Sequence, residues 1–213
     1  MLLLLATNNE HKKREMELIC RPHEVLLPGD FGIEFSHDET GTTFLENSMG
    51  KARTLATILS QAGSRITRPV TAVIADDSGI CADALAGAPG VYTARFGIEE
   101  FGRQPTQEEQ NQLLLDRLAN ETNRAAHYTC VMSAVTEGDT IVTVEEHWNG
   151  RIARSISNGT GGFGYDPIFI PEGMEASAAD MTTSQKHAVS HRGKATRRLL
   201  AALQATVLIV PEL

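Results

Sequence analysis

The chain has 213 residues, of which 41% are hydrophobic and 22% are charged, and its formal net charge is −8. This length supports one sizeable core, so we expect a single domain over residues 1–213. A strongly acidic chain lacks the extended basic surface that a nucleic-acid polymer or an anionic membrane requires. Neither is therefore expected as a partner.

Two features of the sequence concern the compartment. The apolar opening Leu2–Leu5 is too short for a signal peptide, and no basic region precedes it. Cys20, Cys81 and Cys130 are widely spaced and contain no CxxC pair, so neither a disulfide framework nor a zinc site is indicated. We expect a reducing, cytoplasmic location.

The first part of the chain alternates between strands and helices. Four elements are predicted there: a buried strand over Leu2–Ala6, a helix from about Asn9 to Cys20, a helix from Thr43 to near Gly63, and a strand over Val70–Ala75. The second helix is expected to begin at Thr43 because Thr43-Phe44-Leu45-Glu46 has the spacing of a capping box.

The second part of the chain adds a hairpin and further helices. In chain order we predict a helix opened by Thr106 and running through Leu118, strands over His127–Thr136 and Thr140–Trp148, a strand over Ile168–Ile170, a helix capped by Ser190 and running through Leu203, and a closing strand over Val207–Val210. Glu137-Gly138-Asp139 between the two long runs is a hairpin signal, which makes part of the sheet antiparallel. The predicted fold class is α/β, with a mixed, twisted sheet flanked by helices.

The segment Ala75-Asp76-Asp77-Ser78-Gly79 places two carboxylates and a hydroxyl at the expected end of a buried strand. Ligands in α/β proteins gather outside the carboxyl ends of strands, so a metal or substrate site is plausible at this position. The alternative is that the two aspartates only form an Asx-turn in a loop.

A polar turn joins the first strand to the first helix, and its sequence is Thr7-Asn8-Asn9-Glu10-His11-Lys12. Backbone N–H groups at a helix start, together with a hydroxyl and an ammonium, can bind a phosphate. The turn matches neither the Walker spacing nor the dinucleotide fingerprint. In the alternative reading, Asn8 or Asn9 caps the helix and Lys12 is solvated.

Three other groups of residues carry possible chemistry. Glu46 could close the capping box or help to hold Mg2+, a cation that prefers oxygen ligands. The glycine-dense run Gly159–Gly164 could approach a ligand closely or serve as a flexible connector. The last group consists of Lys186, His191 and Arg192, which could bind a small polyanion or form an exposed basic turn.

Taken in order, these segments resemble the inosine triphosphate pyrophosphatase family over nearly the whole chain. The motifs that carry the resemblance are Thr7 to Lys12, Thr43-Phe44-Leu45-Glu46-Asn47-Ser48 with Lys51-Ala52, Ala75 to Gly79 with Gly87-Ala88-Pro89-Gly90-Val91-Tyr92, Gly162-Phe163-Gly164-Tyr165-Asp166-Pro167, and Ser190-His191-Arg192-Gly193. One departure is Asn8, where the family usually has glycine.

The resemblance implies an elongated mixed α/β fold, a homodimer, and Mg2+-dependent hydrolysis of dITP, ITP and XTP to the monophosphate and pyrophosphate. It also implies roles for individual residues. Asp77 is the implied proton acceptor and metal ligand, Glu46 the second metal carboxylate, and Ser78 a substrate contact. Phosphates would be held by Thr7, Asn8, Asn9, Glu10, His11 and Lys12, and the base and sugar end by Phe163, Gly164, Tyr165, Asp166, Lys186, His191 and Arg192.

Two other functions are compatible with the same residues. One is a pyrophosphatase for modified pyrimidine nucleotides, with a similar phosphate end and a different base pocket. The other is a catalytically silent module that senses inosine or xanthosine nucleotides. The joint presence of Glu46, Asp77 and Lys12 disfavours the sensor, which has no need of a water-activating carboxylate.

Overall fold

The structure is a computed structural model that describes residues 1–63 and 68–209. Its chain forms two compact units: Met1–Asp77 with Cys130–Glu145 and the segment from Arg192 onward, and Ser78–Thr129 with Glu146–His191. Three strands contribute residues to both units, namely β3 (Ala72–Ala82), β4 (Ala125–Thr136) and β5 (Ile141–Ile152). The single-domain expectation stays a prediction.

Among the described residues, the strands form a six-stranded sheet in the order β2-β1-β3-β4-β5-β6. In the first unit, β1 (Leu2–Leu5) lies between β2 (Glu24–Leu26) and β3 and pairs in parallel with both, with Leu3 opposite Ala72 and Leu5 opposite Ile74. In the second unit, β5 pairs with β6 (Phe169–Pro171) in the antiparallel direction, so the sheet contains both parallel and antiparallel pairs. The predicted mixed α/β sheet is confirmed.

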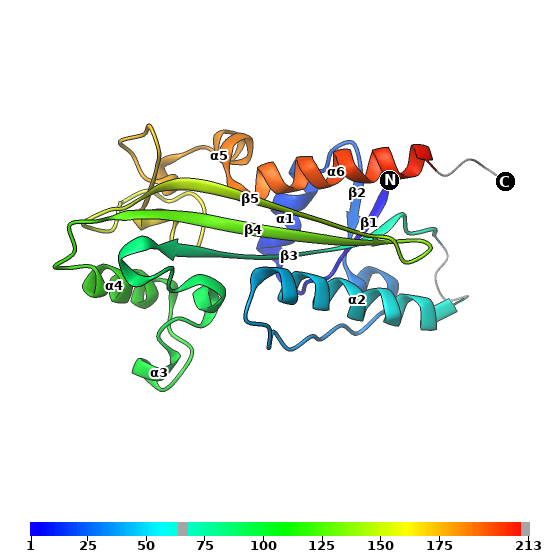
Figure 1. Ribbon diagram of the computed structural model, residues 1–213, viewed down its shortest axis with the longest axis horizontal. Coiled ribbons are helices and arrows are strands. Elements are labelled where there is room, and N and C mark those ends of the chain that lie inside the picture. The colour runs from blue at the N-terminus through cyan, green and yellow to red at the C-terminus, as the bar shows by residue number, and fades with distance from the viewer. Residues whose placement is uncertain (64–67, 210–213) are drawn as a thin grey trace. The chain divides into compact units, whose positions relative to one another are not determined.

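Helices cover both faces of the sheet in the first unit. Figure 1 shows α6 (His191–Ile209) above the strands and α2 (Phe44–Ala62) below them. Helix α1 (Glu10–Ile19) shares an apolar cluster with α6, to which it contributes Met16. Two apolar clusters correspond to these faces. One contains Leu3, Leu5, Ile74, Met16 and Leu199, and the other contains Leu4, Val73, Ala75, Ala52 and Leu55.

The alternation along β3 follows from the strand period of two. Ile74 belongs to the cluster beneath α1 and α6, whereas Val73 and Ala75 belong to the cluster against α2. Because of the same period, the side chain of Asp76 lies on the face toward α1 and α6, and that of Asp77 lies on the face toward α2.

The second unit has its own core of aromatic and aliphatic side chains. It includes Tyr128, Trp148, Phe169, Ile80 and Leu114, all buried. Its helices are α3 (Ile98–Phe101), α4 (Gln107–Arg117) and α5 (Thr183–Val189). This unit also contains short 3-10 helices over Asp83–Leu85, Gly90–Arg95, Asp166–Ile168 and Ala178–Asp180. A further 3-10 helix, Pro28–Phe31, belongs to the first unit.

Several predicted element starts are confirmed. Thr43 and Thr106 each cap a helix through a complete capping box, with Glu46 and Glu109 as the reciprocal acceptors. Helix α6 begins at His191, directly after Ser190, whose backbone is extended (φ −68°, ψ 157°). Three elements were missed: the short strand β2, the single-turn helix α3, and α5, which opens with a capping box at Thr182 and Gln185.

Two predictions about strand ends are wrong. The strand before the acidic pair does not break at Ala75, because β3 continues through Asp76, Asp77 and Ser78 to Ala82. The closing strand is replaced by helix as far as Ile209, and Val210 lies outside the described residues. Over the described ranges, no helix has the length and apolar character needed to cross a membrane.

Candidate active site

Asp76 is the centre of a buried ion cluster in the first unit. Its Oδ2 lies 3.1 Å from Lys12 Nζ on α1 and accepts hydrogen bonds of 3.2 Å from Nε and Nη2 of Arg192 on α6. Arg192 also donates from Nη1 to Glu15 Oε2 at 2.5 Å. Both Asp76 and Arg192 are almost fully buried. This cluster explains how a carboxylate can lie inside a strand.

The cations around Asp76 stabilise its ionised form. Burial alone would raise the pKa of this carboxyl, but Lys12, Arg192 and Lys51 together outweigh it, and the pKa lies well below its usual range. Burial would likewise lower the pKa of Arg192, yet Asp76 and Glu15 raise it. Asp76 therefore stays ionised to lower pH than an ordinary aspartate.

Asp77 lies on the opposite face of β3, where fewer cations surround its carboxylate. Its Oδ1 lies 3.3 Å from Lys51 Nζ and its Oδ2 accepts a 3.0 Å hydrogen bond from Asn47 Nδ2, both on α2. Lys51 is shared, because it also donates to Glu39 Oε1 at 2.6 Å. Asn47 is fixed in turn, since its Oδ1 accepts from Gly41 N.

The charge balance on this face leaves Asp77 easier to protonate. Burial raises the pKa of Asp77, the nearby Glu39 raises it further, and the opposing effects of Lys51 and Asn47 do not compensate. Burial would lower the pKa of Lys51, but Asp77, Asp76 and Glu39 raise it. The pKa of Asp77 is thus raised chiefly by burial, whereas that of Lys51 is raised by the carboxylates around it. Such a carboxylate is suited to accept a proton or to gain a cation.

Glu46 has a defined structural role and one spare oxygen. Its Oε2 accepts hydrogen bonds from Thr42 N at 2.7 Å, Thr42 Oγ1 at 3.0 Å and Thr43 N at 3.2 Å. These bonds, led by the backbone N–H of Thr42, lower the pKa of Glu46. Within the described residues its Oε1 makes no hydrogen bond or ion pair, so it remains able to face a cation.

The donor set on the α2 face fits a hard divalent cation. Asp77 and Glu46 offer carboxylate oxygens, the ligands that Mg2+ prefers, and the negative charge of Asp77 is incompletely balanced. In the part of the chain that the structure describes, no group of three or more His, Cys, Asp or Glu side chains forms a ready metal cage. In proteins, Mg2+ is usually held by one or two carboxylates together with substrate phosphates and water.

The polar turn before α1 is built as a helix start. Asn9 is the N-cap, and its side chain accepts hydrogen bonds from His11 N at 2.9 Å and Lys12 N at 3.3 Å. Thr7 Oγ1 accepts from Asn9 N, and Asn8 Nδ2 donates to Phe35 O. Glu10 and His11 are exposed in the first turn. The capping reading of Asn9 is correct, but Lys12 is bound to Asp76 rather than solvated.

The predicted residues of the base and sugar end divide between the units. Phe163, Asp166 and Lys186 come together in the second unit. Asp166 Oδ2 accepts from Lys186 Nζ at 2.6 Å and from Phe163 N at 2.7 Å, and Lys186 Nζ lies 4.8 Å from the centre of the Phe163 ring. Arg192 belongs to the first unit, where it binds Asp76.

The glycine-dense loop is fixed by its own packing. A Cβ on Gly159 would lie 2.6 Å from the backbone of Ala179, and one on Gly161 would lie 2.8 Å from the same residue's oxygen. At Gly162 (φ +71°) a Cβ would lie 2.0 Å from Asp166 Oδ2. These glycines permit contacts within the protein, so the loop is not a flexible connector.

The other predicted site residues are mostly buried or half-buried. His191 stacks on Tyr128 with ring centroids 4.6 Å apart and planes 4° apart, and it is buried. Tyr165 is a core residue whose hydroxyl donates to Thr93 O at 3.0 Å, and burial raises its pKa. Gly164 is half-buried, and Ser78 follows Asp77 within β3.

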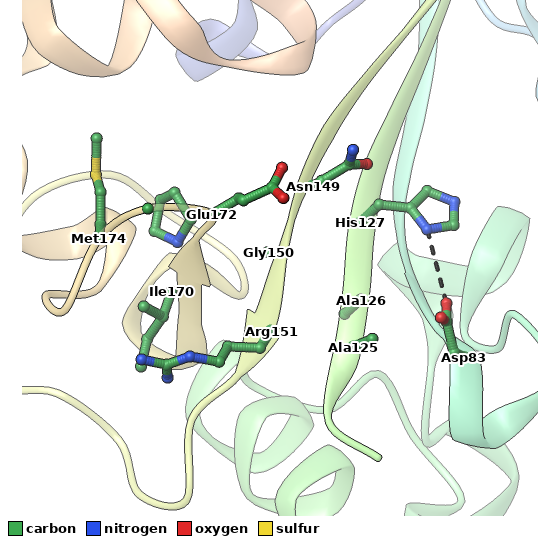
Figure 2. A pocket seen from close by; sticks show the side chains of 12 residues that line it. Asp83, Ala125, Ala126, His127, Asn149, Gly150, Arg151, Ile170, Glu172 and Met174 are labelled. Atoms are coloured by element: carbon green, nitrogen blue, oxygen red, sulfur yellow. Dashed lines mark ion pairs between the residues drawn. The ribbon is translucent and has the colours of Figure 1, made fainter.

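The second unit contains a cavity of about 410 Å3, and none of the predicted site residues lines it. Figure 2 shows the side chains around this cavity. His127 and Asp83 face each other across one side, with His127 Nδ1 3.9 Å from Asp83 Oδ1. Arg151 and Glu172 add exposed charges of opposite sign. This cavity is therefore separate from the residues considered above.

Three charged residues that contact the two aspartates or their partners were not identified from the sequence. Glu15 and Glu39 lie far along the chain from the aspartates they accompany, and Lys51 is apparent only as part of a helix motif. One signal was available. Lys51 follows Asn47 by four residues, which places both on one face of α2.

Comparison with known proteins identifies the family. A family model described as the Ham1 family matches residues 3–202. The chain belongs to this family. It is 40% identical over 195 residues to a dITP/XTP pyrophosphatase of Treponema denticola, covering 92% of this chain and 94% of the relative. It is 38% identical over 208 residues to a dITP/XTP pyrophosphatase of Shigella flexneri, covering 95% and 98%. The resemblance drawn from the motifs is confirmed.

Solved structures of the same family share the fold. The Staphylococcus aureus Ham1 protein superposes with a TM-score of 0.81 at 32% identity, covering 97% of this chain and 100% of that one. A dITP/XTP pyrophosphatase of Mycobacterium abscessus gives a TM-score of 0.71 at 35% identity, covering 94% and 99%.

Proposed function

We propose that this Ham1-family chain hydrolyses the non-standard purine nucleoside triphosphates dITP, ITP and XTP to the monophosphate and pyrophosphate. The observation that carries the proposal is the near full-length match to relatives named dITP/XTP pyrophosphatases. Such an enzyme removes these nucleotides before they can be incorporated into DNA and RNA.

Asp77 is the proposed catalytic residue. Its pKa is raised by burial, so its carboxylate is a better base than that of an exposed aspartate. It would orient and deprotonate the water that attacks the α-phosphorus. Asn47 and Lys51 hold both of its oxygens and so fix the direction of attack.

The phosphates are proposed to lie against the turn Thr7–Lys12, where the N-terminal N–H groups of α1 favour negative charge. Lys12 keeps 17% of its side chain exposed although it binds Asp76, so it can also face the leaving pyrophosphate. Asp77 and Glu46 would hold Mg2+, with which the site would neutralise charge across the phosphates.

Selectivity for the base is proposed to come from hydrogen-bond donors. A 6-oxo purine presents an acceptor where adenine presents an amino group, and a site whose buried donors lose their partner can reject the wrong base by roughly 10⁴-fold. The proposed contacts are Phe163, Gly164, Tyr165, Asp166, Lys186, His191 and Arg192, with Ser78 beside Asp77. A homodimer and a cytoplasmic location complete the proposal, and the three free cysteines accord with the latter.

The test is pyrophosphate release by the purified chain with Mg2+, comparing inosine and xanthosine triphosphates with adenosine, guanosine and modified pyrimidine triphosphates. Release that is selective for inosine and xanthosine and is lost on chelation of the metal is expected. Selective release from the pyrimidine nucleotides would overturn the substrate class. Binding without release would indicate the nucleotide sensor instead.

A further inference from the structure

Helix α4 presents three amide side chains on one face, of which Gln110 and Asn111 are buried and Gln107 is exposed. Gln107, Gln110 and Asn111 are spaced i, i+3 and i+4, so they lie one above another. Gln110 and Asn111 are 6% and 3% exposed. Buried amides are costly unless they are hydrogen-bonded, so their partners indicate why the helix has them.

Two of these amides hold a single glycine. Gly164 N donates to Gln107 Oε1 at 3.0 Å, and Asn111 Nδ2 donates to Gly164 O at 3.1 Å. Gly164 has a φ of +64°, a left-handed conformation that the two flanking bonds maintain. The third amide supports the same region, because Gln110 Nε2 donates to Ala94 O and Phe96 O, next to the Thr93 carbonyl that accepts from Tyr165.

The hydrogen bond of Asn111 fixes the orientation of its amide. A carbonyl oxygen can only accept, so the atom that faces Gly164 O is Nδ2. Asn111 Oδ1 is consequently buried and has no hydrogen-bond partner among the described residues. A leucine would avoid this unsatisfied acceptor, and Leu114 and Leu115 on the same helix are buried apolar residues. Asparagine at position 111 is thus better explained by its bond to the loop than by the packing of α4.

We propose that Asn111 and Gln107 are positioning residues that hold the Gly164 peptide groups and so set the geometry of Phe163–Asp166 for the base end of the substrate. The loop they fix carries Phe163, whose ring lies under Lys186, and Asp166, which binds both Lys186 and Phe163 N. A shift of Gly164 would move the Phe163 ring and the Phe163 N–H together. This inference rests on the proposed function for its substrate, but the hydrogen bonds are independent of it.

The test compares Asn111→Leu and Gln107→Ala with a control, Gln112→Ala. Gln112 is an exposed residue of α4 whose Nε2 donates to Asp116 Oδ1 at 2.7 Å. KM and kcat for inosine triphosphate, the thermal midpoint, and hydrogen exchange of a peptide covering residues 162–166 would be measured. For Asn111→Leu we expect KM to rise about five- to tenfold, because one hydrogen bond to the loop is lost, with little change in kcat. The midpoint should be unchanged or higher and the loop should exchange faster.

Gln107 is exposed, so Gln107→Ala should fold and should show a smaller KM increase of about two- to threefold. Gln107→Glu retains the acceptor for Gly164 N and should restore the wild-type KM, and Gln112→Ala should match the wild type in all four measurements. A lower midpoint for Asn111→Leu with unchanged KM and unchanged loop exchange would overturn the proposal in favour of a purely structural role. Absence of pyrophosphate release by the wild type would instead defeat the proposed function, and loop exchange would still decide whether α4 holds Gly164.

Discussion

The two faces of β3 handle negative charge in opposite ways. On the face toward α1 and α6, Asp76 is held by Lys12 and Arg192, and its pKa is lowered. On the face toward α2, Asp77 shares a single lysine with Glu39, and its pKa is raised. Consecutive residues of one strand thus have opposite electrostatic environments, because the strand period places them in different clusters.

The different surroundings of the two carboxylates indicate which one has a structural role and which one is suited to catalysis or metal binding. A carboxylate that is fully compensated by cations is a poor base and a poor metal ligand, because those cations favour its ionised form and repel a further cation. One that is buried with too little positive charge gains by accepting a proton or a cation. On this reasoning Asp76 organises the α1 and α6 face, and Asp77 reacts.

The largest expected effect is on turnover. Asp77→Asn keeps the size of the side chain and removes the base, so kcat for inosine triphosphate should fall about 10²- to 10⁴-fold. The thermal midpoint should be unchanged or higher at pH 7, since burial disfavours the charge that is removed. Steady-state pyrophosphate release and a thermal melt on the same preparation would check both. An Asp77→Asn enzyme of near wild-type activity would remove Asp77 from the mechanism.

The next largest effect is on stability. Asp76→Asn leaves Arg192 and Lys12 buried or half-buried without their shared carboxylate, which should cost about 3–5 kcal/mol in the free energy of unfolding. Because the folded-state pKa of Asp76 lies below the ordinary aspartate value of about 3.9, its contribution is fully present above that pH and is lost as the pH falls through the folded-state pKa. Denaturant titrations should therefore show the gap between variant and wild type closing below about pH 4. A gap that is constant with pH would contradict this origin.

A smaller effect concerns the pH dependence of activity. Lys51→Met removes the ammonium that favours the ionised form of Asp77, so the acidic limb of kcat/KM should move to higher pH. Lys13→Met is the matched control, because Lys13 is a partly exposed lysine that lies near Glu17 and Asp30 instead. If both variants keep the wild-type profile, Lys51 does not tune the catalytic carboxylate.

The smallest effect separates the two roles of Glu46. Glu46→Gln can still close the capping box, so stability should change little while the Mg2+ concentration for half-maximal activity rises. Thr43→Ala removes the cap instead and should cost about 0.5–2 kcal/mol of stability with no change in the Mg2+ requirement. An unchanged Mg2+ requirement in Glu46→Gln would reduce Glu46 to a helix cap.

Local signals predicted much of the fold. Capping boxes placed the starts of α2 and α4, and the turn at Glu137–Asp139 placed the hairpin. Elements without such signals were missed or misread. The three residues of β2 are too few to show a period, and α5 was overlooked although Thr182 and Gln185 have the spacing of a capping box.

The candidate site was harder to predict because its partners are distant in sequence. Two consecutive aspartates signal a loop in isolation, and they lie in a strand only because Lys12, Lys51 and Arg192 arrive from three helices. Neither Glu39 nor Glu15 belongs to a motif that points to Asp77 or Asp76. Residue types predicted the chemistry, whereas the charge balance that distinguishes Asp76 from Asp77 required the tertiary structure.

The most direct measurement of the central claim is the pair of carboxyl pKa values, obtained by NMR titration of ¹³C-labelled aspartates without divalent cation. Asp76→Asn and Asp77→Asn would assign the two signals. We expect Asp76 to titrate below the ordinary aspartate range and Asp77 to titrate above it. Equal pKa values, or the reverse order, would contradict the division of roles between the two faces of β3.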